Sequence, residues 1–331
     1  MKMPLFNRSC LKIKPLSERE HCLDISAILE LNDNNEGFKH QSLEMVADRI
    51  VSAKDSKSSV IVMMGAHVVR SGAQKYLIDL MEKGYISCIS TNGAGMIHDF
   101  EFAMIGSTTE SVAKYIKEGQ FGLWRETGQL NDIINGAYEN NKDIGMGEAV
   151  GDYINKSEFP YKNISIFANA YRLGIPVTVH VGIGYDIIHS HPNCDGAVLG
   201  KLSYNDFLKF ARVMMNLESG VVANFGSAIM APEVYLKSLS MARNVAYQNN
   251  KSINKFSVLV CDLHDLPSNF REEPLKDNPA YYFRPWKTML VRTVADGGES
   301  FYVRGRHEDT IPALWQYIER VKGQGARGKE E

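Results

Sequence analysis

Residues 59–67 read SVIVMMGAH, a mostly aliphatic run that ends in two small residues and a histidine. An apolar run without alternation is typical of a strand that is buried on both faces of a sheet. Comparable runs recur at 86–90, 177–181, 221–225 and 256–262, and helical patterns separate them. This alternation predicts a doubly wound, Rossmann-like α/β fold, in which helices cover both faces of a parallel sheet.

The spacing of apolar residues also predicts the other elements. Residues 1–38 are expected to form an N-terminal arm and residues 39–322 a single large α/β domain. The glycine-rich, charged residues 323–331 are expected to form a flexible tail. Helices are predicted at 74–83, 110–117, 130–139, 204–217, 234–248 and 311–321, and two more strands at 288–294 and 300–303.

The composition excludes several classes of protein. The 37 basic and 39 acidic residues give a formal charge of −2, whereas a dedicated nucleic-acid binder usually shows a basic excess. No stretch approaches the ~20 apolar residues that cross a bilayer. The five cysteines are odd in number and never form a Cys-x-x-Cys pair, which is typical of reduced thiols. We therefore expect a soluble, cytoplasmic protein that binds neither nucleic acid nor membranes.

A glycine-rich turn follows the second predicted strand. Residues 91–95 read TNGAG and lie directly before a helical pattern. Small residues let the backbone approach a phosphate, and a helix N-terminus favours negative charge. The spacing matches neither the Gly-x-Gly-x-x-Gly fingerprint nor a Walker A loop. The turn is therefore either part of a nucleotide site or a tight connection between strand and helix.

A second segment is dense in residues that bind metals. Zinc accepts these residue types, and a catalytic zinc site needs three of them and an open position. Gly182, Gly184 and Pro192 predict an irregular loop here, so a polar substrate loop is the alternative to a metal-dependent hydrolase or lyase. The segment contains His180, Asp186, His189, His191, Cys194 and Asp195.

A third segment, Arg284-Pro285-Trp286-Lys287, leads into an apolar run. A lysine beside a large aromatic side chain can lose solvation, which frees its amine for nucleophilic or Schiff-base chemistry. An ordinary surface lysine, with its stem packed on the protein, is the alternative.

Taken in order, these motifs resemble those of deoxyhypusine synthase over about residues 60–315. The family's polar triplet with serine-glycine is similar to residues 65–72, and its Thr-Thr-Ala-Gly-Gly turn to residues 91–95. Its Gly-Ser-Leu-Gly-Asp loop resembles residues 182–186, and its glycine run falls on residues 226–228. Its Trp-Gly-Lys motif resembles Trp286-Lys287.

That family uses NAD to transfer an aminobutyl group from spermidine to a protein lysine. The resemblance therefore implies an NAD-dependent transferase with a deoxyhypusine-synthase-like fold. Such an enzyme moves an aminoalkyl group from a polyamine-type donor to an amine or protein-lysine acceptor, through an imine on a lysine. The resemblance also implies a homotetramer whose active sites are shared between subunits.

The resemblance assigns roles to individual residues. It implies no metal site. Lys287 is expected to form the imine, and Glu233 and His189 to move protons. Asp186 is expected to hold the ammonium group, with Trp286 and His98 as further substrate-binding residues. The expected NAD-binding residues are Gly65, Ala66, His67, Thr91, Asn92, Gly93, Ala94, Gly95, Gly182, Gly226, Ser227, Asp262 and Arg306.

The sequence departs from the family at several of these places, including the position of His98, where the family has an acidic residue near Ile97 or His98, and the spacing of Trp286, which directly precedes Lys287. Ala231-Pro232-Glu233 stands where the family has a lysine and paired histidines, and Arg306 stands where it has an aspartate. These changes keep a third interpretation open, in which the protein binds NAD without catalysis.

Overall fold

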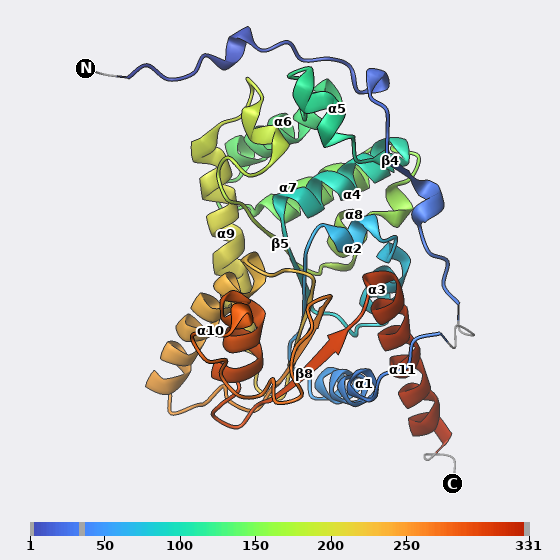
Figure 1. The fold of residues 1–331 in the computed structure, drawn as a ribbon, viewed down its shortest axis with the longest axis vertical. Coiled ribbons are helices and arrows are strands. Elements are labelled where there is room, and N and C mark those ends of the chain that lie inside the picture. Colours follow the sequence, from blue (N-terminus) through green and yellow to red (C-terminus); the bar gives the residue numbers. More distant parts are fainter. Residues whose placement is uncertain (1–2, 33–36, 328–331) are drawn as a thin grey trace.

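A six-stranded parallel sheet forms the centre of the molecule. The computed structural model describes residues 3–32 and 37–327 (Figure 1). The strands lie in the order β5-β3-β2-β6-β7-β8. Numbered along the chain, this is the 3-2-1-4-5-6 order of the doubly wound fold, so the prediction of a Rossmann-like sheet is confirmed. The strand bounds are β2 Val60–Met64, β3 Cys88–Asn92, β5 Val177–His180, β6 Val221–Phe225, β7 Ser257–Asp262 and β8 Glu299–Arg304.

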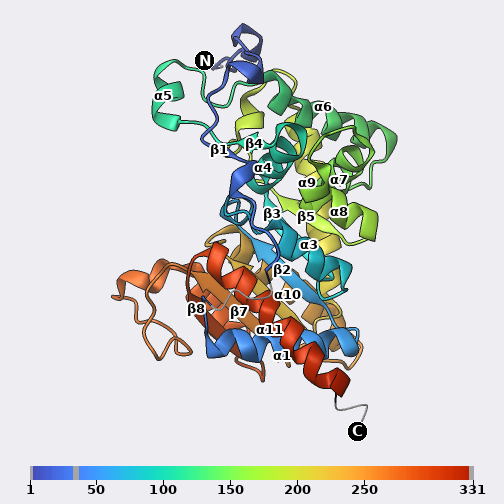
Figure 2. The ribbon, with the colours of Figure 1, turned by 90° about the vertical axis from the view of Figure 1, so that its right-hand side faces the viewer.

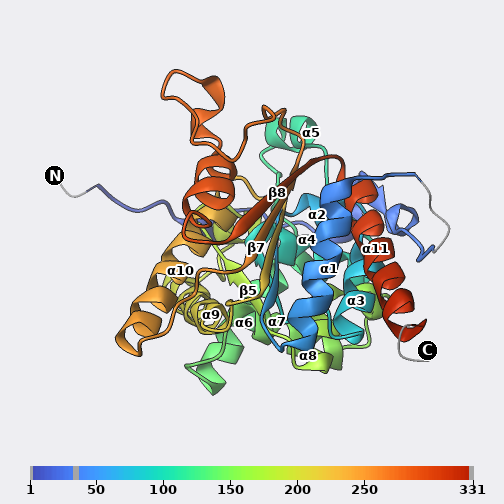
Figure 3. The same ribbon diagram turned by 90° about the horizontal axis from the view of Figure 1, so that it is seen from below.

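Helices cover both faces of this sheet. Alternate residues of β2 point to opposite faces, with Val60 and Val62 in one core cluster and Ile61 and Met63 in the other. Viewed from below, α1 and α11 lie on one face and α10 on the other (Figure 3). The first face carries α1 (Gln41–Asp55), α3 (Gln74–Glu82) and α11 (His307–Arg327), and the second carries much of α9 (Gly196–Met214), α10 (Met230–Gln248) and the π-helix η7 (Pro285–Arg292).

A helical layer is inserted between β3 and β5 and stands above the sheet (Figure 2). The N-terminal residues run over this layer, and their strand β1 (Leu23–Asp24) pairs with β4 (Ser107–Thr108). Among the described residues, no helix combines the length and apolarity needed to cross a membrane. The layer contains α4 (Gly93–Ile105), α5 (Val112–Lys117), α6 (Arg125–Asn140), α7 (Met146–Lys156) and α8 (Ile166–Leu173), and the short α2 (His67–Arg70) follows β2.

Three sequence predictions are corrected here. The strand predicted at 288–294 is wrong, because residues 288–292 belong to η7 and residues 293–294 form a turn. Met289 and Leu290 of this helix pack into the core. Helix α9 begins eight residues earlier than predicted, since the Asp195 carboxylate accepts the first backbone N–H groups. The predicted tail at 323–331 is helical as far as Arg327, and residues 328–331 lie outside the described residues.

One buried carboxylate ties the helical layer to the sheet. Asp206 of α9 accepts hydrogen bonds from the backbone N–H groups of Gly147 at the start of α7 (3.0 Å) and Val179 in β5 (2.9 Å). Burial nevertheless raises the pKa of Asp206 to about 7, because it disfavours the charged form more than these hydrogen bonds favour it.

This raised pKa predicts a specific pH dependence of stability. The folded state keeps the Asp206 proton between about pH 4 and 7, where the unfolded chain has lost it, so this group stabilises at low pH and the effect is lost as pH rises to 7. In Asp206→Asn this slope should vanish. The difference in unfolding free energy between the two proteins should therefore change by a few kcal/mol, at ~1.4 kcal/mol per pKa unit. Urea unfolding from pH 4 to 7 measures it, and parallel curves would contradict the assignment.

Candidate functional site

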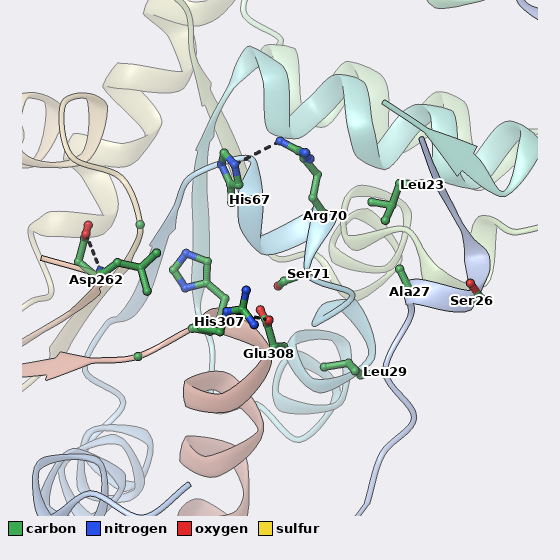
Figure 4. A pocket seen from close by; sticks show the side chains of 14 residues that line it. Leu23, Ser26, Ala27, Leu29, His67, Arg70, Ser71, Asp262, His307 and Glu308 are labelled. Atoms are coloured by element: carbon green, nitrogen blue, oxygen red, sulfur yellow. Dashed lines mark hydrogen bonds and ion pairs between the residues drawn. The ribbon is translucent and has the colours of Figure 1, made fainter. Parts of the chain in front are cut away.

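A cavity of about 730 Å³ opens at the carboxyl ends of β2, β6, β7 and β8. In doubly wound sheets, ligands bind in this crevice at the point where the strand order reverses, which here is between β2 and β6. The N-terminal arm forms one wall, from Leu23 to Leu29 (Figure 4). The polar residues of the lining are Ser26, His67, Arg70, Ser71, Asp262, Arg306, His307 and Glu308.

Two glycines bring the central strand ends together at this cavity. A Cβ on Gly65 would lie 2.6 Å from the carbonyl oxygen of Gly226. Gly226 itself has φ +65°, and a Cβ there would lie 2.4 Å from Nε2 of His307. Both positions therefore require glycine, and the chain can turn away from each strand without filling the crevice.

Burial favours the neutral form of the two histidines of this cavity. Burial, and then the nearby Arg70, lower the pKa of His67, and its Nε2 accepts a hydrogen bond from the Arg70 guanidinium at 3.2 Å. Burial likewise lowers the pKa of His307. Its Nδ1 is buried and has no hydrogen-bond partner among the described residues. Arg306 is largely exposed, with Glu308 3.4 Å away.

A smaller cavity of about 290 Å³ adjoins the first, and Arg70 lines both. Asp186, His98 and Ala94 line it, so the structure brings two of the predicted substrate-binding residues together. Burial raises the pKa of Asp186 to about 6, although the carboxylate accepts a hydrogen bond from the backbone N–H of Ala94.

Asp186 also explains the glycine-rich turn at 91–95. A Cβ on Gly93 would lie 2.0 Å from an Asp186 carboxylate oxygen, and one on Gly95 would lie 2.3 Å from the Thr91 hydroxyl. The side chain of Asn92 accepts from the backbone N–H of Gly95 and caps α4. The glycines thus make room for side chains of the protein itself, and none of residues 91–95 lines the larger cavity.

Hydrogen bonds fix the proton positions on the two histidines near Asp186. The Nδ1 atom of His189 accepts from the backbone N–H groups of Gly184 (3.1 Å) and Asp186 (3.2 Å), so its proton is on Nε2, 3.7 Å from the carboxylate. The Thr108 hydroxyl donates to Glu101 and must accept from Nδ1 of His98, 2.7 Å away. Nε2 of His98 is therefore unprotonated, and burial lowers the pKa of this residue to about 4.

A buried ion pair supports this cavity. Arg19 of the arm donates two hydrogen bonds of 2.8 Å to the two oxygens of Glu101, and both side chains are only 1% exposed. Glu101 also accepts from the hydroxyls of Thr108 and Thr127. Arg19 thus neutralises the negative charge of Glu101, and both carboxylate oxygens accept hydrogen bonds from the protein itself.

Three predicted residues lie elsewhere. Lys287 is buried, and its Nζ lies 3.5 Å from the centre of the Tyr281 ring. The Trp286 indole N–H donates to backbone carbonyls of the preceding loop. The Glu233 carboxylate pairs with Lys237 and Arg284, which hold its pKa below the usual value. None of Lys287, Trp286 and Glu233 lines either cavity.

Of the other predicted NAD-binding residues, some lie at the larger cavity and some do not. His67, Gly226, Asp262 and Arg306 line the larger cavity, and Gly65 shapes it. Ala66, Gly182 and Ser227 do not line it. The sequence analysis gave no role to Arg70 or His307, which also line the larger cavity. Each follows the carboxyl end of a strand by a few residues, and that position is the sequence signal by which they could have been predicted.

The segment 180–195 does not assemble a metal centre. In the part of the chain that the structure describes, no three His, Cys, Asp or Glu side chains come together as ligands. The His180 ring packs against Phe210, and Nε2 of His191 lies 2.8 Å from the carbonyl oxygen of Gly122. These histidines have structural contacts, so the metal-dependent alternative is not favoured.

Comparisons with known proteins agree with this fold. Residues 44–138 match a family model described as the C-terminal Rossmann fold of arginine dihydrolase ArgZ-like proteins. The chain is 20% identical over 248 residues to a deoxyhypusine synthase-like protein of Chlorobaculum parvum. The matched region covers 67% of this chain and 69% of that protein. The resemblance to deoxyhypusine-synthase-like proteins is thereby confirmed.

Two solved structures show the same fold. One is a putative LOR/SDH protein from Methanococcus maripaludis, 15% identical with a TM-score of 0.50 over 89% of this chain and 74% of that chain. The other is a mutant of AgrE in complex with L-arginine, 15% identical with a TM-score of 0.50 over 87% of this chain. The chain spans about a third of AgrE, at 34% of its length.

The buried ion pair predicts an asymmetric response to mutation. Arg19→Ala should destabilise the protein by about 3–5 kcal/mol, because it leaves the Glu101 carboxylate buried without a counter-charge. Arg49→Ala is the matched control, since the Arg49–Glu299 pair is about 40% exposed and should be worth at most about 1 kcal/mol. Urea unfolding at pH 7 measures both, and equal losses would contradict the special role of Arg19.

Proposed function

We propose that this chain is an NAD-dependent enzyme of the deoxyhypusine-synthase-like type that acts on a small substrate with an amino group. One observation carries the proposal. The larger cavity lies where the strand order reverses, and a smaller cavity with a carboxylate adjoins it. The volume of the larger cavity, about 730 Å³, lies within the ~300–1,000 Å³ of typical ligand sites. The match to a Rossmann-fold family model supports the choice of a dinucleotide.

The residues of the larger cavity suit NAD. Arg306 and Arg70 are cations that can pair with the two phosphates, and Arg306 directly precedes α11. The Asp262 carboxylate can accept from ribose hydroxyls. The buried Nδ1 of His307 can reach a polar group of a ligand, since no described residue pairs with it. Bound NAD would accept a hydride from the carbon that carries the substrate nitrogen.

The residues of the smaller cavity can handle a protonated amine. The Asp186 carboxylate would hold the ammonium group, and this holds best above about pH 6, where the carboxylate is ionised. The unprotonated Nε2 of His98 would take the proton that the amine loses, with Thr108 and Glu101 holding the ring in place. His189, whose Nε2 lies 3.7 Å from the Asp186 carboxylate, would be a second residue that moves protons there.

Transfer of an aminoalkyl group is the finer part of this proposal. Lys287 would attack the oxidised carbon, expel the donor amine and carry the group as an imine. An acceptor amine would then displace the Lys287 amine, and the hydride taken up in the first step would return to the carbon. Because Lys287 lines neither cavity of its own chain, this step requires a shared site, as in the homotetramer that the resemblance implies, or a movement of the loop that carries Tyr281.

Binding of NAD can be tested at an exposed cation of the larger cavity. Arg306→Ala should weaken NAD binding about ten-fold or more, because it removes one charge-assisted hydrogen bond to a phosphate. Arg304→Ala is the matched control, since Arg304 is similarly exposed but pairs with Asp265 and does not line the cavity. Isothermal titration with NAD measures both variants, and no binding to the unchanged protein would refute the proposed cofactor.

The role of Lys287 has its own test. Borohydride added during turnover with NAD and a polyamine should attach the aminoalkyl group to Lys287, and Lys287→Ala should abolish this labelling. Mass spectrometry of the tryptic peptides identifies the modified residue. Labelling that survives in Lys287→Ala would disprove the assignment, and NAD binding with neither labelling nor NADH formation would favour the non-catalytic interpretation.

A further inference from the structure

Lys287 is a buried cation whose neighbours are aromatic rings. It is 6% exposed, and none of the ion pairs between described residues includes it. Its Nζ lies 3.5 Å from the centre of the Tyr281 ring and 5.8 Å from that of Tyr282. Ring faces attract cations, so the two tyrosines replace part of the water that the ammonium group loses on burial. Covered in this way, the amine cannot meet a substrate.

One segment of the chain provides this cover. Residues 273–282, which we call the lid, belong to the orange segment that stands out from the body of the molecule in Figure 2. Before the lid, the Trp286 indole N–H donates to the carbonyl oxygens of Phe270 and Glu272, at 2.8 and 3.1 Å. After the lid, Phe283 is buried. Most residues between these two attached flanks are exposed, so the lid can move while the flanks stay in place.

Arg292 attaches the lid to η7, the same helix that carries Lys287. Its guanidinium donates two hydrogen bonds to the Glu273 carboxylate. Glu273 first, and then Tyr281, raise the pKa of Arg292 because both stabilise its charged form. The side chains of Arg292 and Glu273 are 46% and 42% exposed, and an ion pair with this exposure contributes little to stability. The contacts that close the lid are therefore weak enough to break and re-form.

The π-helical form of η7 brings its two cations to the same side. Hydrogen bonds in a π-helix join residues five apart, as from the Thr293 N–H to the Thr288 carbonyl oxygen at 3.2 Å. Lys287 and Arg292 are also five residues apart, so they lie about one turn apart along the helix. In an α-helix, with about 3.6 residues per turn, they would point about 140° apart, and one of them would face away from Tyr281.

We propose that the lid closes over Lys287 in the resting protein and opens before Lys287 reacts, with Tyr281 and Arg292 as its closing contacts. The closed lid keeps the amine away from carbonyl compounds other than the substrate. It also explains why Lys287 lines neither cavity of its own chain. That the uncovered amine takes part in group transfer rests on the proposed function, whereas the lid itself can be tested without NAD.

Chemical labelling measures how often the lid opens. N-hydroxysuccinimidyl acetate acetylates accessible amines, and mass spectrometry of the peptides gives the rate at each lysine. In the unchanged protein without NAD, Lys287 should react about ten-fold or more slowly than the exposed Lys276, because the minor state of such an equilibrium is populated to about 10% at most. In Tyr281→Ala the rate at Lys287 should rise about ten-fold, the effect of losing one desolvated cation–ring contact, while the rate at Lys276 stays the same.

Three further variants separate lid opening from a general loss of structure. Tyr281→Phe keeps the ring and should keep Lys287 protected. Tyr282→Ala is the matched control, because Tyr282 is 79% exposed and its ring lies farther from the Lys287 Nζ, so the rate should stay near that of the unchanged protein. Arg292→Gln removes the pair with Glu273 and should raise the rate by a smaller factor than Tyr281→Ala. Circular dichroism confirms that each variant is folded.

Any of three results would overturn the inference. They are acetylation of Lys287 as fast as that of Lys276 in the unchanged protein, no faster reaction in Tyr281→Ala, and an equal increase in Tyr281→Ala and Tyr282→Ala. An unchanged rate in Arg292→Gln would disprove the role of Arg292 in closing the lid. Because all these rates are measured without NAD, failure of NAD to bind would refute the proposed function separately.

Discussion

The close contact between Gly65 and Gly226 is the constraint on which the sheet and the larger cavity both depend. β2 and β6 are adjacent, yet the chain leaves β2 toward β3 and leaves β6 toward β7, on opposite sides of the sheet. The two connections must separate directly beyond the strand ends, where a Cβ on Gly65 would lie 2.6 Å from the Gly226 carbonyl oxygen. A side chain at either position would push the strands apart or fill the crevice. The same contact therefore closes the sheet and leaves the crevice open for a ligand.

The N-terminal arm completes both cavities although it contributes nothing to the sheet. Arg19 lines the smaller cavity, and the residues around Ala27 line the larger one. The arm is held by the buried pair with Glu101, by its strand pairing with β4, and by a contact so close that a Cβ on Gly72 would lie 1.8 Å from the Ala27 carbonyl oxygen. Loss of the arm's contacts would expose the buried Glu101 charge and open both cavities together, so stability and ligand binding are coupled through this segment.

Sequence alone predicts the sheet well, because buried parallel strands are uninterrupted apolar runs, and β6 has the bounds predicted for it, 221–225. It fails at residues 288–294, where β-branched side chains suggest a strand but tertiary packing of Met289 and Leu290 stabilises a π-helix. The sequence leaves open whether the glycines at 93 and 95 make room for a phosphate or only form a tight turn, and in the structure Asp186 and Thr91 lie against them. Spacing along the chain cannot distinguish a small residue that accommodates a ligand from one that accommodates a side chain of the same protein.

The position of Asp186 also determines which helix end remains for a phosphate. The N-terminus of α4 offers backbone N–H groups and a partial positive charge, and the Asp186 carboxylate already accepts from the N–H of Ala94 there. A phosphate at the same place would bring a second anion against a buried carboxylate, which Coulomb repulsion strongly disfavours. If the chain binds NAD as proposed, this repulsion would direct the phosphates to the other end of the crevice, where Arg306 precedes α11 and Arg70 follows β2. In the proposed complex Asp186 would thus keep the amine and the phosphates apart, with Arg70, which lines both cavities, between them.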